Sequence, residues 1–227
     1  EAWENLARKL AHEIKNPLTP IQLTIDRLKS KYSEKIAEHE KDDFSKSLLI
    51  IGKQIKQIEN LVNEFSDFAR MPKPILHDNN IVPLIKDSIK LVNELDSKII
   101  IEFKTNKSDV LLNSDSEQLS RVFFNLIKNS VESIQDRKNN NVDLIGKIDI
   151  SINESSKKIN FIIIDNGLGF GIFADNIKNI LNPYFTTKKK GTGLGLAIVN
   201  KIINDHNGKI NFVSLEDGAK IEIMFTK

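Results

Sequence analysis

The chain has 227 residues, 40% of them hydrophobic, so it is long enough for one large domain or two smaller ones with a packed core. Its 33 basic and 31 acidic residues give a formal net charge of +2, which offers no electrostatic argument for binding nucleic acid or an acidic membrane surface. Cysteine is absent, which excludes disulfides, thiolate metal sites and cysteine nucleophiles and fits a reducing compartment.

No apolar run approaches the roughly 20 residues that a membrane helix needs, and the first residues carry no signal-peptide pattern. The chain begins at Glu1, inside a periodic helix and without an initiator methionine. We therefore expect a cytoplasmic fragment of a longer protein, with no membrane contact of its own.

The first predicted helix runs from about residue 1 to about Lys31. Apolar residues recur along it at alternating steps of three and four: Ala7, Leu10, Ile14, Leu18, Ile21, Ile25 and Leu28. At about 100° per residue, the centre of this stripe lies on the order of 160° from His12. His12 therefore points outward, with Glu13 beside it and Asn16 one turn further along. A merely structural histidine would lie within the stripe, so we expect something outside the helix to reach His12.

A second amphipathic helix follows a polar connection over residues 32–42. Its apolar residues keep the same spacing: Leu48, Ile51, Ile55, Ile58, Val62, Phe65 and Ala69. Pro17 predicts a kink in the first helix, and residues 71–74 end the second one. Two such helices cannot enclose a core, so we expect two copies of the hairpin to form a four-helix bundle. Packing of the hairpin on the downstream domain is the alternative, which the regular seams disfavour.

After Pro74 the pattern changes to mixed strands and helices, so we expect two domains, residues 1–72 and 73–227. Strands are predicted at 75–77, 99–104, 110–113, 147–153 and 158–165, and 209–214 with 220–225 as a hairpin around Glu216–Gly218. Helices are predicted at 81–95, from after Ser114 to about Arg137, and at 194–205, with Ser114 and Glu117 as a capping box. The chain is thus α+β, with a helical hairpin followed by an α/β sandwich that has one helical layer.

Two asparagines lie four residues apart on the predicted helix after Ser114. Asn125 and Asn129 share one face of a helix whose many apolar residues imply burial, where an idle amide is costly. An amide oxygen is also a suitable neutral ligand for Mg²⁺. A pair of solvated surface amides is the alternative.

A predicted buried strand leads directly into Asp165-Asn166-Gly167-Leu168-Gly169. The aspartate can accept a hydrogen bond from an exocyclic amino group, and the glycines let the backbone turn close to a ligand. An ordinary aspartate-glycine turn is the alternative.

Lys190-Gly191-Thr192-Gly193-Leu194-Gly195 opens the last predicted helix, where backbone N–H groups make an anion site and Lys188 to Lys190 add positive charge. The glycine spacing is not that of a dinucleotide fingerprint, and no Gly-Lys-Ser or Gly-Lys-Thr of a Walker loop follows. The long segment between Gly167 and Gly191 contains several aromatics, including Phe185, and is predicted to be a lid. A solvated lysine loop, with aromatics packed on the sheet, is the alternative.

Together these stretches resemble, in order along the whole chain, the five sequence boxes of sensor histidine kinases. Residues 11–20 resemble the phosphoacceptor box, 125–130 the asparagine box, 165–169 the first glycine box, 183–188 the phenylalanine box and 191–197 the second glycine box. Within the family, residues 16–23 and 65–74 are most similar to nitrogen-regulation sensor kinases of NtrY type.

The resemblance implies a homodimeric phosphotransfer hairpin followed by an ATP-binding domain of the gyrase, Hsp90 and MutL type. It implies ATP-dependent autophosphorylation of His12, transfer to an aspartate of an NtrX-like response regulator, and phosphatase activity toward that regulator. Glu13 would orient the His12 tautomer and accept its proton, and Asn16 would orient water in the reverse chemistry. A plain exposed charge is the alternative for Glu13. The full-length protein would be membrane-anchored through segments upstream.

The resemblance also implies ATP with Mg²⁺ as the nucleotide, its adenine near Asp165, Mg²⁺ on Asn129 and Asn125, and its phosphates under the lid. The residues expected to contact it are Asn125, Asn129, Asp165, Gly167, Gly169, Phe185, Lys188, Lys190, Gly191, Thr192, Gly193, Leu194 and Gly195. Many sensor kinases have a lysine three residues after the second asparagine, where this chain has Glu132. Neutralising the phosphates would then fall to Lys188–Lys190, with Lys128 as a further candidate.

Two competing functions remain open from the sequence. A water-directed ATPase of the same fold is disfavoured by Asn125, because an amide cannot act as a base where gyrase-like relatives have a glutamate. A nucleotide-binding scaffold without turnover is disfavoured by the complete set of boxes.

Overall fold

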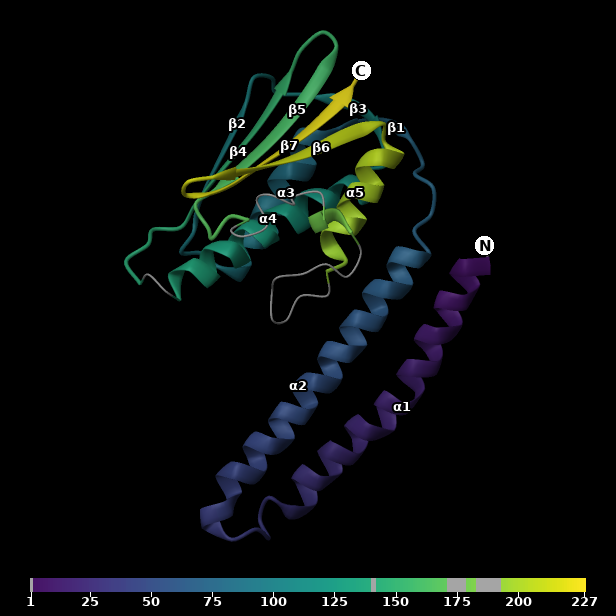
Figure 1. Cartoon of the computed structure of the whole chain (residues 1–227), viewed down its shortest axis with the longest axis vertical. Helices are drawn as coiled ribbons and strands as arrows, with labels where there is room; N and C mark the ends of the chain where they lie inside the picture. The colour runs from purple at the N-terminus through teal and green to yellow at the C-terminus, as the bar shows by residue number, and fades with distance from the viewer. Residues whose placement is uncertain (1, 140–141, 171–178, 183–192) are drawn as a thin grey trace. The chain divides into compact units, whose positions relative to one another are not determined.

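The computed structural model describes residues 2–139, 142–170, 179–182 and 193–227 (Figure 1). The chain divides into two compact units, one built around residues 1–72 and the other around residues 73–186 and 195–227. We call them the helical hairpin and the α/β unit and describe each by itself. No helix among the described residues carries an apolar stretch long enough to cross a membrane.

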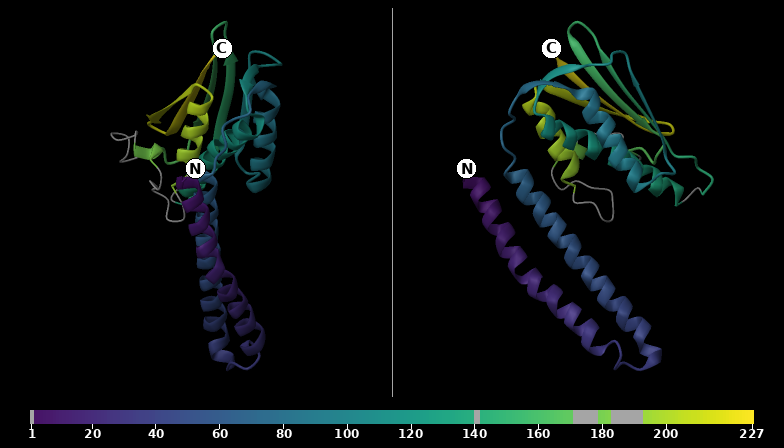
Figure 2. Two further views of the ribbon diagram at one scale, coloured as in Figure 1. Left: turned by 90° about the vertical axis from the view of Figure 1, so that its right-hand side faces the viewer. Right: turned by 180° about the vertical axis from the view of Figure 1, so that it is seen from behind.

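The helical hairpin consists of α1 (Ala2–Tyr32) and α2 (Glu38–Ala69), which run antiparallel (Figure 2). α1 continues through Pro17 and Pro20 as one helix. α2 begins within the stretch that was predicted to be a connection, because Glu38 and Glu40 place acidic side chains in its first turn, where the helix dipole favours them. The connection between the helices is therefore limited to residues 33–37.

Only part of the predicted apolar seam is buried in the hairpin. Ile25, Leu48 and Ile55 form a small core, against which Leu18 and Phe44 pack. Ala7, Ala11 and Val62 are also buried. Six other large seam residues are 37–45% exposed: Leu10, Ile14, Ile21, Leu28, Ile51 and Ile58. A single hairpin thus covers about half of its own apolar stripe.

Among the residues that the structure describes, the α/β unit contains a five-stranded sheet, a two-stranded ribbon and three α-helices. Its elements are β1 (His77–Asn80), α3 (Ile81–Leu95), β2 (Ile100–Thr105), β3 (Leu111–Ser114), α4 (Ser116–Lys138), β4 (Lys147–Glu154), β5 (Lys158–Asp165), α5 (Gly195–Asp205), β6 (Gly208–Leu215) and β7 (Gly218–Thr226). The sheet order is β2-β4-β5-β7-β6, with β2 parallel to β4 and the other pairs antiparallel, and β1 pairs with β3. The three helices cover one face of the sheet (Figures 1 and 2).

The core lies between α4 and the central strands. Every second residue of these strands is buried: Ile148, Ile150, Ile152, Ile159, Phe161, Ile163, Ile221, Ile223 and Phe225. α4 contributes Val122, Phe123, Leu126, Ile127 and Ile134, all fully buried. The Phe123 and Phe161 rings lie 5.0 Å apart between centroids. The prediction of an α/β sandwich with one helical layer is confirmed.

Two local predictions were wrong by a few residues. The strand expected at 75–77 forms instead at His77–Asn80, where polar residues pair with β3. The capping box expected at Ser114 does not form, because Ser114 is buried in β3 and its hydroxyl donates to the Leu112 carbonyl oxygen at 3.0 Å. Asp115 caps α4 instead and accepts from the backbone N–H groups of Glu117 and Gln118.

Candidate active site

The turn after β5 is held around a buried carboxylate. Asp165 is 5% exposed, although it ends a strand. Its Oδ2 accepts from the Ser130 hydroxyl at 2.9 Å, and its Oδ1 accepts from the Gly167 backbone N–H at 2.9 Å. The carboxylate is therefore oriented from both sides. Such a group can accept a hydrogen bond from an amino group of a ligand.

The glycines of this turn permit close packing within the protein. A Cβ on Gly167 would lie 2.3 Å from the Ser133 Oγ. Gly169 has a φ of +67°, and a Cβ there would lie 2.5 Å from the Gly218 carbonyl oxygen. The turn therefore packs closely against α4 and against the start of β7. A side chain in place of Gly167 or Gly169 would displace the turn.

Three α4 residues that the sequence reasoning did not assign a role hold the same turn. Ser130 binds Asp165, and Ser133 accepts the Leu168 N–H with its hydroxyl at 3.0 Å. Arg137 donates to the Asn166 and Gly167 carbonyl oxygens at 3.0 and 3.3 Å. The sequence did contain a signal for this role. Ser130, Ser133 and Arg137 follow one another at steps of three and four on an otherwise buried helix, so they share one face.

The asparagine pair lies on the same helix. Asn125 and Asn129 are both half-buried and one turn apart, and Ser133 follows Asn129 by another turn. Lys128 pairs with Glu132 at 3.8 Å on the exposed side. Among the described residues, no group of three or more His, Asp or Glu side chains could hold a metal. The role of Asn125 and Asn129 as magnesium ligands stays a prediction.

The second glycine stretch is only partly described. Phe185, Lys188, Lys190, Gly191 and Thr192 lie outside the described residues. Gly193 has a φ of +71°, Leu194 is fully buried and Gly195 opens α5. The expected phosphate-binding role of this stretch, and the expected lid, thus stay predictions.

The predicted phosphoacceptor His12, with Glu13 and Asn16 as its predicted helpers, lies on α1 in the helical hairpin. His12, Glu13 and Asn16 are all exposed, whereas Ala11 beside them is buried in the hairpin. Glu13 lies 3.9 Å from the Lys9 ammonium, four residues earlier on the helix. His12 is thus accessible from outside the hairpin.

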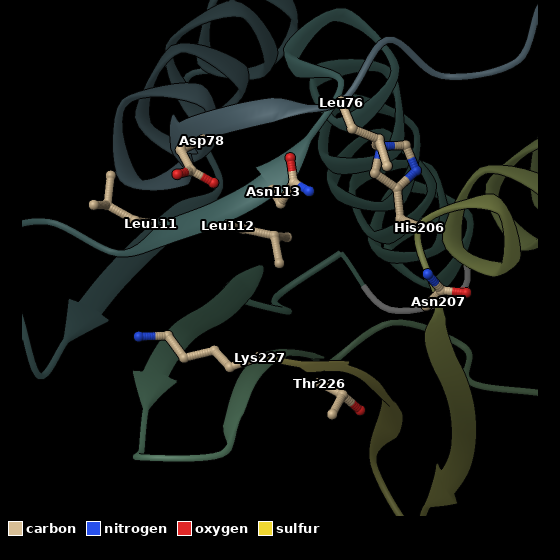
Figure 3. A pocket seen from close by; sticks show the side chains of 9 residues that line it. All are labelled: Leu76, Asp78, Leu111, Leu112, Asn113, His206, Asn207, Thr226 and Lys227. Atoms are coloured by element: carbon tan, nitrogen blue, oxygen red, sulfur yellow. The ribbon is translucent and has the colours of Figure 1, made fainter.

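A second histidine, His206, has a structural role at the end of α5. Its Nδ1 lies 2.8 Å from the Ile202 carbonyl oxygen, and its Nε2 accepts from the Asp115 N–H at 2.9 Å. It helps to line a hollow of about 340 Å³ between the β1–β3 ribbon and the end of β7. Figure 3 shows His206 among the side chains that surround this hollow. None of the predicted site residues lines this hollow, and both ring nitrogens of His206 are engaged within the fold.

Asp115 connects this region to α4. Burial by itself would raise the pKa of its carboxyl, but the backbone N–H groups of Ile75, Gln118 and Glu117 hold that pKa below its ordinary value. The Ile75 N–H donates to Asp115 Oδ2 at 3.0 Å. The ionised carboxylate therefore both caps α4 and fastens the segment that precedes β1.

Both parts of the chain match known domain families. Residues 2–74 match the His Kinase A (phospho-acceptor) domain, and residues 114–227 match the Histidine kinase-, DNA gyrase B-, and HSP90-like ATPase family. An exposed histidine on a helical hairpin and a buried aspartate in an α/β sandwich agree with this pair of domains. The chain belongs to the sensor histidine kinase family, in which it comprises the phosphoacceptor domain and the ATPase domain.

Within that family the chain is similar to NtrY-type proteins. It is 38% identical to the putative sensor histidine kinase NtrY-like of Rickettsia felis, over 99% of this chain and 36% of that protein. It is 36% identical to the nitrogen regulation protein NtrY of Azorhizobium caulinodans, over 99% of this chain and 28% of that protein. The chain thus spans about a third of the length of these relatives.

Solved structures share the fold. The nucleotide-free catalytic domain of histidine kinase ThkA superposes with a TM-score of 0.57 at 28% identity, over 67% of this chain and 95% of that chain. ThkA in complex with the response regulator protein TrrA gives a TM-score of 0.68 at 26% identity, over 98% of this chain and 61% of that chain.

Proposed function

We propose that this chain is the catalytic core of a sensor kinase that phosphorylates His12 with ATP and passes the phosphoryl group to a response-regulator aspartate. One observation carries the proposal: a single chain combines an exposed histidine on a phosphoacceptor hairpin with a buried, doubly hydrogen-bonded Asp165 in an ATPase fold. The response regulator bound to ThkA supports the second transfer. An NtrX-like regulator, and phosphatase activity toward it through Asn16, complete the proposal.

ATP would bind against the α4 face of the α/β unit. The exocyclic amino group of adenine donates to Asp165, whose carboxylate is already oriented by Ser130 and Gly167. Asn129 and Asn125 would hold Mg²⁺ through their amide oxygens, and the bound ion would neutralise part of the phosphate charge. Gly193, Leu194, Gly195 and the residues before them would cover the phosphates.

The transfer to His12 is an in-line displacement. A ring nitrogen of neutral His12 forms a bond to the γ-phosphorus, the bond from that phosphorus to the bridging oxygen breaks, and ADP leaves. Glu13 accepts the proton that the ring loses, since a carboxylate next to the imidazole stabilises that tautomer. The exposure of His12 supports this role, because the group that delivers the phosphoryl must approach from outside the hairpin. Asn125 offers no base for activating water, which disfavours simple hydrolysis.

The hairpin would act as a homodimer. Six large seam residues stay 37–45% exposed in a single hairpin, and a second copy would cover them in a four-helix bundle. We also propose that residues 1–72 and 73–227 are the functional domains, and that the full-length protein is anchored in a membrane with this part in the cytoplasm.

Incubation with γ-labelled ATP and Mg²⁺ tests the function. We expect label on the protein that is labile in acid and stable in base, as a phosphoramidate is. His12→Ala should abolish the label yet retain nucleotide binding, whereas His39→Ala, an exposed histidine of α2, serves as the matched control and should be labelled normally. An unlabelled wild-type protein would refute the kinase activity, and labelled His12→Ala would refute only the acceptor.

A further inference from the structure

Arg137 lies in the last turn of α4 and joins two turns that are far apart in the sequence. Its Nη1 donates to the carbonyl oxygens of Asn166 and Gly167 at 3.0 and 3.3 Å. Its Nη2 donates to the Asp217 carboxylate at 2.6 Å, in the turn between β6 and β7. The Arg137 side chain is 25% exposed and that of Asp217 is 74% exposed. Arg137 is thus the less exposed member of the pair, and its guanidinium contacts the turn after β5.

One peptide group connects Arg137 to the Asp165 carboxylate. The carbonyl oxygen of Asn166 accepts from Arg137, and the N–H of the same peptide, which belongs to Gly167, donates to Asp165 Oδ1 at 2.9 Å. A cation on the carbonyl side polarises the peptide and strengthens the hydrogen bond that its N–H makes. Arg137 therefore acts on Asp165 without touching it.

Further contacts hold the residues on either side of this peptide. The Asn166 side chain accepts from the Lys147 N–H at 2.7 Å and donates to the Ile145 carbonyl oxygen at 2.8 Å. On the other side, a Cβ on Gly218 would lie 1.8 Å from the Asp165 carbonyl oxygen, so the β6–β7 turn is in direct backbone contact with it. Asp217 anchors Arg137 at the same place.

We propose that Arg137 is a positioning residue for recognition of the nucleotide base: it fixes the Asn166–Gly167 peptide and thereby orients the Asp165 carboxylate toward the adenine amino group. This inference rests on the proposed function, because it needs adenine at Asp165. A planar guanidinium is required, since it serves two carbonyl oxygens and a carboxylate at once, whereas a lysine ammonium cannot reproduce that fork.

The test compares ADP with purine riboside diphosphate, which lacks the 6-amino group, by calorimetric titration of the whole chain. Wild type should prefer ADP by about tenfold or more, the worth of one hydrogen bond to a charged group. Arg137→Met keeps the apolar stem but loses the fork. It should weaken ADP binding by about tenfold and leave the analogue within about twofold, so that the preference disappears.

Three further variants separate positioning from general stability. Arg137→Lys should restore the preference only in part, and Asp217→Ala, at an exposed position, should reduce it by about twofold to threefold because the inner contacts remain. Lys201→Ala removes the Lys201–Asp205 ion pair within α5, which is 2.9 Å long, and should keep the wild-type preference. If Arg137→Met does not fold, Arg137→Lys and Asp217→Ala carry the test.

Three other outcomes of the titrations would contradict the inference or the proposed function. An Arg137→Met variant that keeps the wild-type preference, or that loses affinity for both ligands equally, overturns the inference in favour of a purely structural contact. A wild-type chain that binds both ligands equally contradicts base recognition at Asp165 and the inference with it. A wild-type chain that binds neither ligand contradicts the proposed function itself.

Discussion

The helical hairpin and the α/β unit bury their apolar residues to different extents. In the α/β unit, α4 and the central strands enclose side chains such as Phe123, Phe161 and Ile150 that have no appreciable exposure. In the hairpin, the core cluster of Ile25, Leu48 and Ile55 keeps 7–8% exposure, and large seam residues keep 37–45%. A unit with a closed core is stable alone, whereas one with half a core depends on a partner to cover the rest.

The largest expected effect is within the closed core. Phe123→Ala should lower the free energy of unfolding of the α/β unit by about 3–5 kcal/mol, since it leaves a cavity beside Phe161. Urea unfolding followed by circular dichroism measures this loss, which should not depend on protein concentration. A loss below about 1 kcal/mol would mean that this core is not as closed as its burial indicates.

The next effect concerns the open half of the hairpin. Ile21→Asp places a charge on the seam and should raise the dissociation constant of the dimer about thirtyfold, equivalent to about 2 kcal/mol. Sedimentation equilibrium measures this change. Leu23→Asp is the matched control, because Leu23 is 63% exposed and lies on the opposite face of α1. If Leu23→Asp dissociated the dimer and Ile21→Asp did not, the dimer interface would lie on the face of α1 opposite the predicted seam.

A smaller effect is expected at the cap of α4. Asp115→Ala should cost about 1 kcal/mol of stability near neutral pH, as the loss of an N-cap does. Because the folded pKa of Asp115 is lowered, its contribution is complete above the unfolded pKa of about 3.9 and is lost as the pH falls through the folded pKa. The stability difference from wild type should therefore shrink in acid.

Urea titrations at pH 7 and at pH 3 measure the difference, with Asp136→Ala, an exposed carboxylate of the same helix, as the control. An Asp115→Ala deficit that is as large in acid as at neutral pH would show that the ionised carboxylate is not what stabilises the helix start.

The smallest effect is expected on the surface of α4. Lys128→Ala removes an exposed pair with Glu132 and should change stability by less than about 0.5 kcal/mol. Because Lys128 is already engaged with Glu132, we expect ATP affinity to change less than about twofold. Calorimetric titration measures this, and a large loss of affinity would identify Lys128 as a phosphate-binding cation after all.

Local patterns predicted most of the elements because they depend on neighbouring residues. Asn80 marks the start of α3 as a helix cap, and the run ending at Asp165 gives the bounds of β5. The β1 strand was misplaced, since its polar residues pair with β3 only through the tertiary fold. The Ser114 cap was misplaced because burial in β3 assigns that hydroxyl another partner.

Two candidate site residues could be proposed from the sequence because their position in the local pattern is unusual for their residue type. His12 lies on the polar face of α1, and Asp165 lies at the end of an apolar run. The hydrogen bonds that hold Asp165 and its turn could not be predicted, because Ser130 and Arg137 make them only once α4 packs against β5. Arg137 in particular depends on Asp217, whose place beside it is set by the register of β6 and β7. The role of a residue that acts through such long-range contacts cannot be recognised from the local spacing of residues in the sequence.

The parallel pairing of β2 with β4 bears on the order of folding. Short turns join β4 to β5 and β6 to β7, so each of these pairs loses little chain entropy when it forms. In contrast, β2 pairs with β4 only after Ile100 meets Lys147, and β3 and the whole of α4 lie between them in the sequence. We therefore expect two hairpins to form early and to recruit β2 late. The same strand, at the edge of the sheet, should open first, so its amide protons would exchange before those of β5 and β7.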